Sequence, residues 1–203
     1  MLRPPPPRKQ PTRRPQTTQG RAAGPQTTKP TFDIISCAVE PSGLVLLTSL
    51  VVAASNQPGP IIEIGTLAGI STTHIALYKR PGQQLITVDN YSWNPWGLSK
   101  ESHFSIAQTV LRYLVEKGEI QQIVADKLYF YDEYHPSEPP ALFFTDAMHT
   151  YDDVMQDVAW ARKVGAQVIC GHDYCDEFPG VKQAVDELGG YSQLQGRLWV
   201  LKS

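Results

Sequence analysis

The amino-acid sequence predicts an α/β protein with a Rossmann-like, doubly wound sheet of seven strands, mostly parallel and closed by an antiparallel C-terminal hairpin. From residue 31 onward, short apolar stretches alternate with longer segments whose apolar residues recur at helical spacing. Strands separated by helices form βαβ units, which imply parallel pairing. The last two predicted strands are joined directly at Gln195 to Arg197, so they must run antiparallel. Hydrophobic residues make up 41% of the chain and charged residues 19%, as expected of a soluble globular domain.

The first elements follow from apolar stretches and the residues that interrupt them. A strongly apolar helix is expected over residues 43–55, ended by Asn56 and the Pro-Gly-Pro sequence at 58–60. Residues 61–64 then read as a short buried strand, and Gly65 to Gly69 as a turn into a helix that runs to about residue 80. Residues 85–89 form the second predicted strand.

In the middle of the chain, helical periodicity separates three further strands. A helix that Gly118 closes carries Phe104, Ala107, Leu111 and Leu114 on one face. Strands are expected over residues 120–125, 141–146 and 166–171, and between the last two Val154, Met155, Val158 and Ala161 line a helix. No helix is predicted between residues 125 and 141.

The C-terminal segment predicts one helix and the closing hairpin. Residues 179–188 form a helix whose apolar face holds Val181, Ala184, Val185 and Leu188. Strands are expected over residues 191–195 and 198–202.

Residues 1–30 differ in composition from the remaining residues, 31–203, which form the predicted domain. This N-terminal segment holds eight of the seventeen prolines, seven basic residues and no acidic residue, a composition that predicts a disordered tail. It is either a solvated extension or a Pro-rich ligand or polyanion tether. The chain as a whole has a formal charge of −2, so the domain carries −9 against +7 in the tail. A domain of that charge repels phosphate backbones, so no nucleic-acid partner is expected for it.

Composition also indicates the compartment. The longest uncharged stretch lies between Glu40 and Glu63, but its prolines and glycines leave too short an apolar segment to span a bilayer. The basic N-terminus is not followed by an apolar segment, so neither a secretory signal nor a membrane location is expected. The three cysteines form no CxxC pair. A reducing, cytoplasmic location is therefore predicted.

Polar residues follow the predicted strands at the edge of the sheet where α/β proteins bind ligands. After the first strand, two glycines four positions apart permit a tight turn and a close approach to a ligand, although a generic turn has the same pattern. After the second strand, Asp89 is placed to accept hydrogen bonds from ribose hydroxyls. After the third, Asp126 could accept from an adenine amino group. For both acids, a solvated strand end is the alternative.

Strands four and five are predicted neighbours, which brings Asp146, His172 and Asp173 together. Two carboxylates and an imidazole can hold a divalent cation with positions open for substrate oxygens. His149, one helical turn beyond Asp146, could act as a general base. The alternatives are salt bridges or helix caps, and Asp146 in particular could cap the following helix.

Aromatic residues gather in two predicted loops, where they either wall a substrate cleft or pack into the core. They are Tyr91, Trp93 and Trp96 after the second strand, and Tyr131, Tyr134 and His135 after the third. His74, His103 and Cys170 lie within helices or a strand and are expected to be structural.

These motifs together resemble class I S-adenosylmethionine-dependent methyltransferases. The similar features are EIGTLAGIST from Glu63 to Thr72, Asp89, DxxHxY from Asp146 to Tyr151, and HDY from His172, with PGVK starting at Pro179. The chain is most similar to the methyltransferase-24 group, which is related to the macrocin and mycinamicin O-methyltransferases. The resemblance covers about residues 40–203 and is carried by the order and spacing of the motifs.

The resemblance implies an enzyme that binds S-adenosylmethionine over the first three strand ends and methylates the hydroxyl group of a small molecule. The implied cofactor-binding residues are Glu63, Gly65, Thr66, Gly69, Ser71, Asp89 and Asp126. The implied catalytic residues are His149, as base, and Asp146. The implied ligands of Mg²⁺ or another divalent cation are Asp146, His172 and Asp173, with His172 replacing the usual oxygen ligand, so that it either binds the metal, positions a ligand, or belongs to a site without metal.

Two other classes of function stay open from the residues alone. A module of the same fold without catalysis could bind a nucleotide or a protein partner. A nicotinamide-dependent oxidoreductase is disfavoured because the glycine loop has no third glycine. Sugar, polyol, phenol and peptide hydroxyls are all acceptable acceptors, and a homo-oligomer that completes the cleft is an option.

Overall fold

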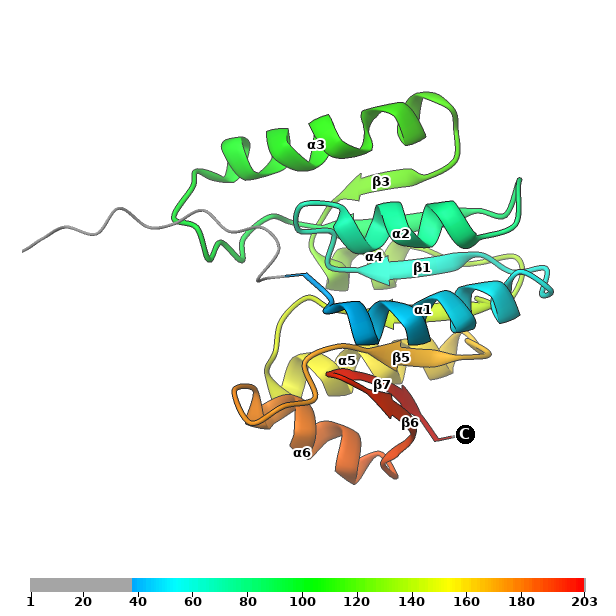
Figure 1. Cartoon of the computed structure of the whole chain (residues 1–203), viewed down its shortest axis with the longest axis vertical. Coiled ribbons are helices and arrows are strands. Elements are labelled where there is room, and N and C mark those ends of the chain that lie inside the picture. The colour runs from blue at the N-terminus through cyan, green and yellow to red at the C-terminus, as the bar shows by residue number, and fades with distance from the viewer. Residues whose placement is uncertain (1–37, 203) are drawn as a thin grey trace, which may run out of the picture. The chain divides into compact units, whose positions relative to one another are not determined.

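The computed structural model describes residues 38–202, which form a seven-stranded sheet with helices on both faces (Figure 1). The predicted tail over residues 1–30, and Cys37, lie outside the described residues. The strands are β1 (Ile61–Ile64), β2 (Leu85–Asp89), β3 (Gln121–Val124), β4 (Leu142–Thr145), β5 (Ile169–Gly171), β6 (Tyr191–Gln195) and β7 (Leu198–Leu201). The helices are α1 (Pro41–Ala54), α2 (Ile70–Tyr78), α3 (Lys100–Glu116), α4 (Lys127–Glu133), α5 (Tyr151–Lys163) and α6 (Pro179–Glu187).

The strand order is β3-β2-β1-β4-β5-β7-β6. The first five strands pair in parallel, and β7 runs antiparallel to both β5 and β6. The predicted fold class is therefore confirmed. Because the chain winds outward from β1 in one direction and from β4 in the other, the carboxyl ends of these two strands flank the switch point where such sheets bind ligands.

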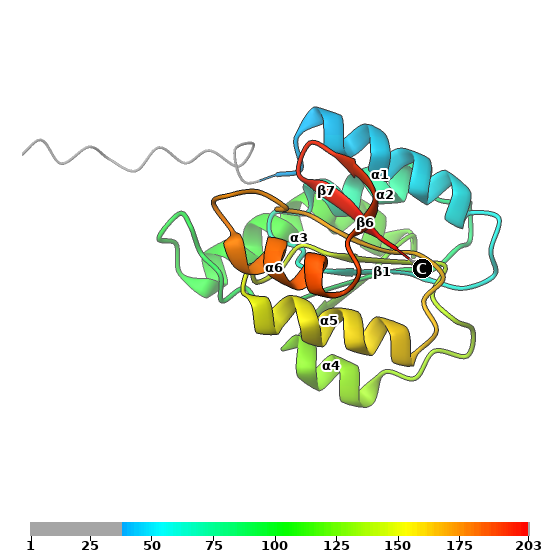
Figure 2. The same ribbon diagram turned by 90° about the horizontal axis from the view of Figure 1, so that it is seen from below.

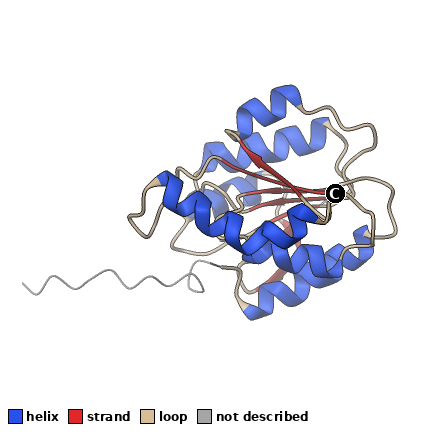
Figure 3. Ribbon diagram, turned by 90° about the horizontal axis from the view of Figure 1, so that it is seen from above, coloured by secondary structure: helices blue, strands red, loops and turns tan. Residues whose placement is uncertain are grey.

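The sheet forms the middle layer between two sets of helices (Figure 3). One apolar core holds residues of α1, α2 and α3, and the other holds residues of α4, α5 and α6. In Figure 2, α1 and α2 lie on one side of the sheet and α4 and α5 on the other. Strand β1 serves both cores, since Ile61 packs into the first and Ile62 and Ile64 into the second. Strands covered on both faces are mostly apolar, which explains the three isoleucines of β1, and Glu63 is the one exception in this strand.

Helix α5 shows how local sequence sets the start of a helix beside the switch point. Thr150 is the N-cap and its hydroxyl accepts a hydrogen bond from the backbone N–H of Asp153. Acidic residues occupy the first turn and basic residues the last, which favours the helix dipole. Asp146 therefore does not cap α5, which was one of the interpretations of its position in the sequence.

The structure corrects one predicted element. Residues 127–133, expected to be loop, form α4, a helix of seven residues. Asp126 caps it by accepting a hydrogen bond from the backbone N–H of Leu128 at 2.9 Å. So short a helix shows no readable apolar period, and its packing against the sheet stabilises it instead. No helix within residues 38–202 combines the length and the apolar composition that a membrane span requires.

Candidate active site

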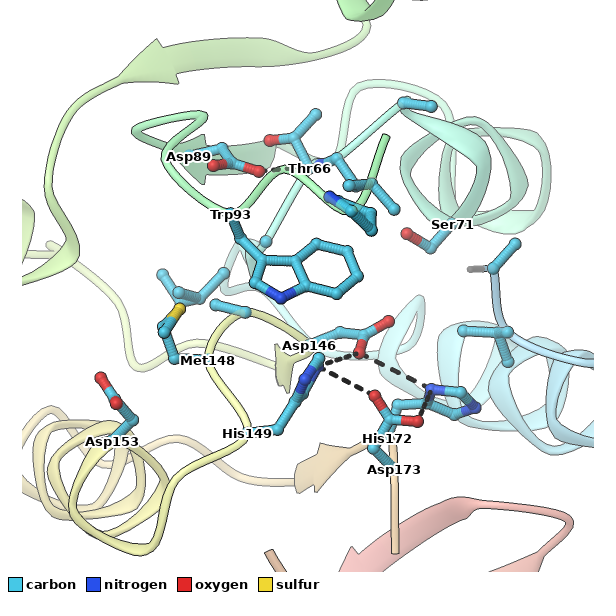
Figure 4. Close-up of a pocket in the computed structure, with 18 of the residues that line it drawn as sticks. Thr66, Ser71, Asp89, Trp93, Asp146, Met148, His149, Asp153, His172 and Asp173 are labelled. Carbon is cyan, nitrogen blue, oxygen red and sulfur yellow. Dashed lines mark hydrogen bonds and ion pairs between the residues drawn. The ribbon is translucent and has the colours of Figure 1, made fainter. Parts of the chain in front are cut away.

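A cavity of about 630 Å³ opens at the carboxyl ends of the parallel strands. It has the size of a typical ligand site. Most of the predicted site residues line it, namely Gly65, Thr66, Ser71, Asp89, Asp126, Asp146, His149, His172 and Asp173. The two exceptions are Glu63 and Gly69. Figure 4 shows the cavity with the Asp89 carboxylate on one side and the acidic and histidine side chains on the other.

The loop between β1 and α2 brings backbone close to the cavity. Gly65 has a φ of 101°, and a Cβ built there would lie 2.2 Å from the carbonyl oxygen of Asp146. Only glycine therefore lets the ends of β1 and β4 approach this closely. Gly69 is the N-cap of α2 and supplies no side-chain cap, so the first N–H groups of α2 are left for a ligand. Ser71, in this first turn, lines the cavity.

Asp89 is held at the end of β2 by two backbone groups. Its Oδ2 accepts a hydrogen bond from the N–H of Leu67 at 2.8 Å, and its Oδ1 accepts one from the N–H of Tyr91 at 2.7 Å. Each oxygen keeps a second lone pair for a ligand. The carboxylate therefore links the glycine loop to the loop after β2 and faces the cavity that both enclose.

Asp126 lies at the same end of the cavity. Besides capping α4, it accepts a hydrogen bond from Nδ2 of Asn90 at 3.2 Å. Lys127 also lines the cavity, but its ammonium group is engaged with Asp153 at 2.8 Å and with the buried Asp157 at 2.7 Å.

Glu63 lies beneath the glycine loop and is completely buried. Its Oε2 accepts a hydrogen bond from the hydroxyl of Thr72 at 2.5 Å, whereas Oε1 has no hydrogen-bond partner. Burial raises the pKa of Glu63 to about 7, and the interactions with the hydroxyls of Ser71, Thr72 and Thr87 only partly offset this effect. Through the hydrogen bond with Thr72, Glu63 stabilises the first turn of α2.

Asp146, His149 and Asp173 form a compact cluster on the other side of the cavity. One ligand atom from each lies within 4.8 Å of the others. His149 Nε2 is 2.9 Å from Asp173 Oδ2 and 3.9 Å from Asp146 Oδ1. Asp173 has a positive φ of 62°, a conformation that is uncommon for a residue other than glycine and that often marks a functional site. These contacts appear as dashed lines in Figure 4.

His172 lies beside this cluster but is turned toward Glu40. Its Nε2 is 2.7 Å from Glu40 Oε2, and its Nδ1 is 3.3 Å from Asp173 Oδ1 and 3.6 Å from Asp146 Oδ1. Burial lowers the pKa of His172, but the charge of Asp146 and hydrogen bonds to both aspartates outweigh it and raise the pKa to about 11. The compact three-residue cluster thus contains His149 in the place that the sequence assigned to His172.

Glu40 is a cavity residue that the sequence did not reveal. It precedes α1, and its Oε1 also accepts a hydrogen bond from the backbone N–H of Arg197 at 2.6 Å. A Cβ at Gly196 would lie 1.6 Å from this oxygen, so a larger residue there would displace the Glu40 carboxylate from its present position. No spacing rule connects Glu40 with His172, because 132 positions separate them.

The aromatic residues divide between cleft and core. Trp93 and Phe178 line the cavity and flank the imidazole of His149, with ring centroids 5.5 Å and 4.2 Å away. Tyr91 and Trp96 are buried. Tyr131 is also buried and stacks on Trp160 at 4.5 Å, and the half-buried Tyr134 stacks on Phe130 at 4.8 Å, whereas His135 is exposed.

The three residues that were expected to have structural roles, His74, His103 and Cys170, have contacts that agree with such roles. His74 is hydrogen-bonded to the hydroxyl of Thr48 at 2.7 Å. His103 is completely buried between the rings of Tyr91 and Trp96, and Cys170 is buried within β5.

The fold and this site define a class of protein, and comparison with known families agrees with it. Residues 62–174 match the model of the methyltransferase-24 family, which is described as a methyltransferase domain. The match covers more than half of the chain, so the protein belongs to this methyltransferase family. The resemblance found in the sequence is thereby confirmed.

Solved structures show the same fold. The O-methyltransferase TomG from Streptomyces achromogenes, in complex with S-adenosylmethionine, is 22% identical, with 77% of this chain and 71% of that chain covered and a TM-score of 0.55. An O-methyltransferase from Bacillus cereus, in complex with S-adenosylhomocysteine, is 18% identical over 76% and 71% of the two chains, with a TM-score of 0.55. The calicheamicin enzyme CalS11, a TDP-rhamnose 3′-O-methyltransferase, is 15% identical over 78% and 77%, with a TM-score of 0.56. No curated protein matches the chain.

Proposed function

We propose that this protein is an S-adenosylmethionine-dependent O-methyltransferase that acts on the hydroxyl group of a small molecule. The observation that carries the proposal is that one cavity joins two sets of groups, the glycine loop with Asp89 and the Asp146–His149–Asp173 cluster. The first set has the chemistry to bind a nucleoside cofactor, and the second has the chemistry to prepare an oxygen nucleophile. Three of the structures with the same fold are described as O-methyltransferases, two of them with S-adenosylmethionine or its product bound.

In the cofactor half, each predicted residue has a role that its position allows. The free N–H groups of α2, with Gly65, Thr66 and Ser71 around them, would bind the carboxylate of the methionine part. Asp89 would accept hydrogen bonds from the ribose hydroxyls. Asp126 would lie by the adenine. Glu63 and Gly69 would act indirectly, by shaping the loop and the start of α2.

In the acceptor half, His149 would act as the base. Methyl transfer is an in-line displacement in which the acceptor oxygen bonds to the methyl carbon while the sulfonium sulfur leaves with the electron pair. The acceptor hydroxyl must lose its proton in this step. Because Asp173 bonds to Nε2 of His149, it favours the tautomer with hydrogen on Nε2, which leaves Nδ1 to accept that proton. Trp93 and Phe178 hold the imidazole between them.

The acidic cluster also fits a divalent cation. Asp146, His149 and Asp173 offer two carboxylates and one imidazole within 4.8 Å of one another, a donor set that suits Mn²⁺, Fe²⁺ or Zn²⁺ better than Mg²⁺. A cation bound there would lower the pKa of the acceptor hydroxyl and fix two neighbouring oxygens. His149 would then be a ligand through Nε2. A direct metal contact by His172 stays a prediction, since its Nε2 is bonded to Glu40.

Calorimetric titration with S-adenosylhomocysteine tests the cofactor site. We expect binding in the micromolar range, and we expect Asp89→Asn to weaken it about tenfold, or about 1.4 kcal/mol, because the amide offers one acceptor oxygen in place of two. Asp132→Asn, on the exposed side of α4, is the matched control and should bind normally. Unchanged affinity in Asp89→Asn would remove Asp89 from the site.

The same titration bears on the class of function. Repeating it with Mg²⁺, with Mn²⁺ and after chelation shows whether a metal contributes to cofactor binding. A protein that binds no S-adenosylhomocysteine under any of these conditions would instead be a non-enzymatic module of the same fold.

A further inference from the structure

Four side chains form a series of polar contacts that runs from the start of α1 to His149. Oε2 of Glu40 lies 2.7 Å from Nε2 of His172. On the other side of this ring, Nδ1 lies 3.3 Å from Oδ1 of Asp173, and Oδ2 of the same carboxylate lies 2.9 Å from Nε2 of His149. Figure 4 shows the two contacts of Asp173. We call these four residues the Glu40–His149 series.

The carboxylate of Glu40 is held in place by the closing hairpin. Oε1 accepts a hydrogen bond from the backbone N–H of Arg197 at 2.6 Å, so the two oxygens have separate partners. Glu40 is the N-cap of α1, but its side chain makes no capping hydrogen bond. The carboxylate is therefore not needed to start α1, and its two short contacts lead instead to the residues after β5 and to the β6–β7 turn.

The backbone of His172 is fixed by the sheet, whereas its ring direction depends on Glu40. The carbonyl of His172 accepts a hydrogen bond from Nε1 of Trp199 at 3.0 Å, and its N–H donates to the carbonyl of Thr145 at 3.2 Å. These bonds leave the side chain free to rotate. Because the ring is buried, Nε2 without its carboxylate partner would be unfavourable, and the ring would turn. Glu40 therefore directs Nδ1 toward Asp173.

Asp173 joins the two imidazole rings, because each of its oxygens faces one of them. If His172 turned away, Oδ1 would lose its partner and the carboxylate could rotate, which would alter its contact with His149. The rings of Trp93 and Phe178 pack against His149, but an aromatic contact does not distinguish the two ring nitrogens. The carboxylate contact is what favours hydrogen on Nε2. The position of Asp173 therefore affects which nitrogen of His149 is free to accept a proton.

We propose that Glu40 is a positioning residue of the acceptor site, which acts on His149 through His172 and Asp173. By holding the ring of His172, Glu40 keeps Asp173 in place to bond Nε2 of His149, so that Nδ1 stays free to accept the proton of the acceptor hydroxyl. Its effect on the reaction is thus indirect. This inference rests on the proposed function, which gives His149 its role as base.

Nuclear magnetic resonance of the ¹⁵N-labelled full chain tests this role, because the ring nitrogens of a histidine report which of them carries hydrogen. The chain has five histidines, and the variant that lacks each one assigns its signals. A chelator keeps cations out of the acidic cluster during the measurement. In wild type we expect hydrogen on Nε2 of both His172 and His149. In Glu40→Ala we expect the single form of His149 to be lost to a mixture of its two tautomers.

Two further variants separate this role from a general effect on the fold. Ser42→Ala is the matched control, because it removes a polar side chain beside Glu40 in the first turn of α1 and leaves the Glu40–His149 series intact. It should leave the His149 signals as in wild type. His172→Phe interrupts the series at its second residue, so Glu40→Ala should add no further change to His149 in that background. Thermal unfolding checks that each variant is folded.

Three results would overturn the role of Glu40. The first is a set of His149 signals that is the same in wild type and Glu40→Ala. The second is an equal change in Ser42→Ala, and the third is a change that persists in the His172→Phe background. Titration with S-adenosylhomocysteine separates this inference from the proposed function. A protein that does not bind it would refute the proposed function, whereas normal binding with unchanged His149 signals would refute only the role of Glu40.

Discussion

His149 is the residue on which two explanations of the acceptor site diverge. As a base it uses one nitrogen to take a proton while Asp173 orients the other, and as a metal ligand it uses Nε2 itself. Both readings rest on the 2.9 Å contact with Asp173. They differ in what happens when the imidazole is removed.

We expect His149→Ala to abolish turnover and to leave the affinity for S-adenosylhomocysteine within about twofold of wild type, since the ring lies in the acceptor half. Titration with Mn²⁺ then separates the two roles. If His149 is only a base, wild type and variant bind Mn²⁺ equally or not at all, and if it is a ligand, the variant loses affinity. Unchanged turnover with an accepted substrate would contradict both roles.

Single site residues were predictable from the sequence where they stand at a strand end or within one or two helical turns after it. Asp89, Asp146 and Asp173 follow apolar strands directly, and the strand order brings them to one cavity. Glu40 follows no strand and reaches His172 only because α1 packs on the sheet next to β4 and the closing hairpin, a contact that no local pattern encodes. The hydrogen bond with Glu40 orients the His172 ring toward α1. The sequence therefore did not predict which residue His172 contacts.

At the scale of elements, the strands and long helices were predictable and α4 was not. Burial on both faces makes β1 and β4 mostly apolar, and α3, α5 and α6 have an apolar side at helical spacing. Helix α4 consists of seven residues and is fixed by its cap at Asp126 and by Phe130 and Tyr131 in the core. Such a helix depends on tertiary packing, which a propensity argument cannot supply.

The turn after β1 is restricted by a close contact between its backbone and the end of β4. We expect Gly65→Ala to lower the thermal stability strongly and to abolish S-adenosylhomocysteine binding, because its Cβ would lie 2.2 Å from the carbonyl oxygen of Asp146. Gly82→Ala is the matched control, since Gly82 also has a positive φ, of 76°, but no atom within 4 Å of its Cβ position. It should cost only about 1–2 kcal/mol for backbone strain and should bind normally. Equal effects in the two variants would show that strain, and not the approach of β1 to β4, explains the glycine.

For the whole molecule, the buried carboxyl of Glu63 links stability to pH. Its pKa is raised from 4.5 to about 7 by burial, so between these pH values the folded protein binds a proton that the unfolded chain has released. The free energy of unfolding must therefore fall as pH rises through this window. A shift of this size corresponds to about 3 kcal/mol.

Glu63→Gln should remove this dependence, because the amide keeps the shape of the protonated carboxyl but does not ionise. Denaturant unfolding of wild type and variant at pH 5 and at pH 8 measures it, and the difference between the two proteins isolates Glu63 from the other titrating groups. We expect the variant to gain stability relative to wild type as the pH rises from 5 to 8. A difference that stays constant over this range would mean that Glu63 is ionised in the folded protein throughout, with Oε1 bound to a partner such as an ordered water molecule.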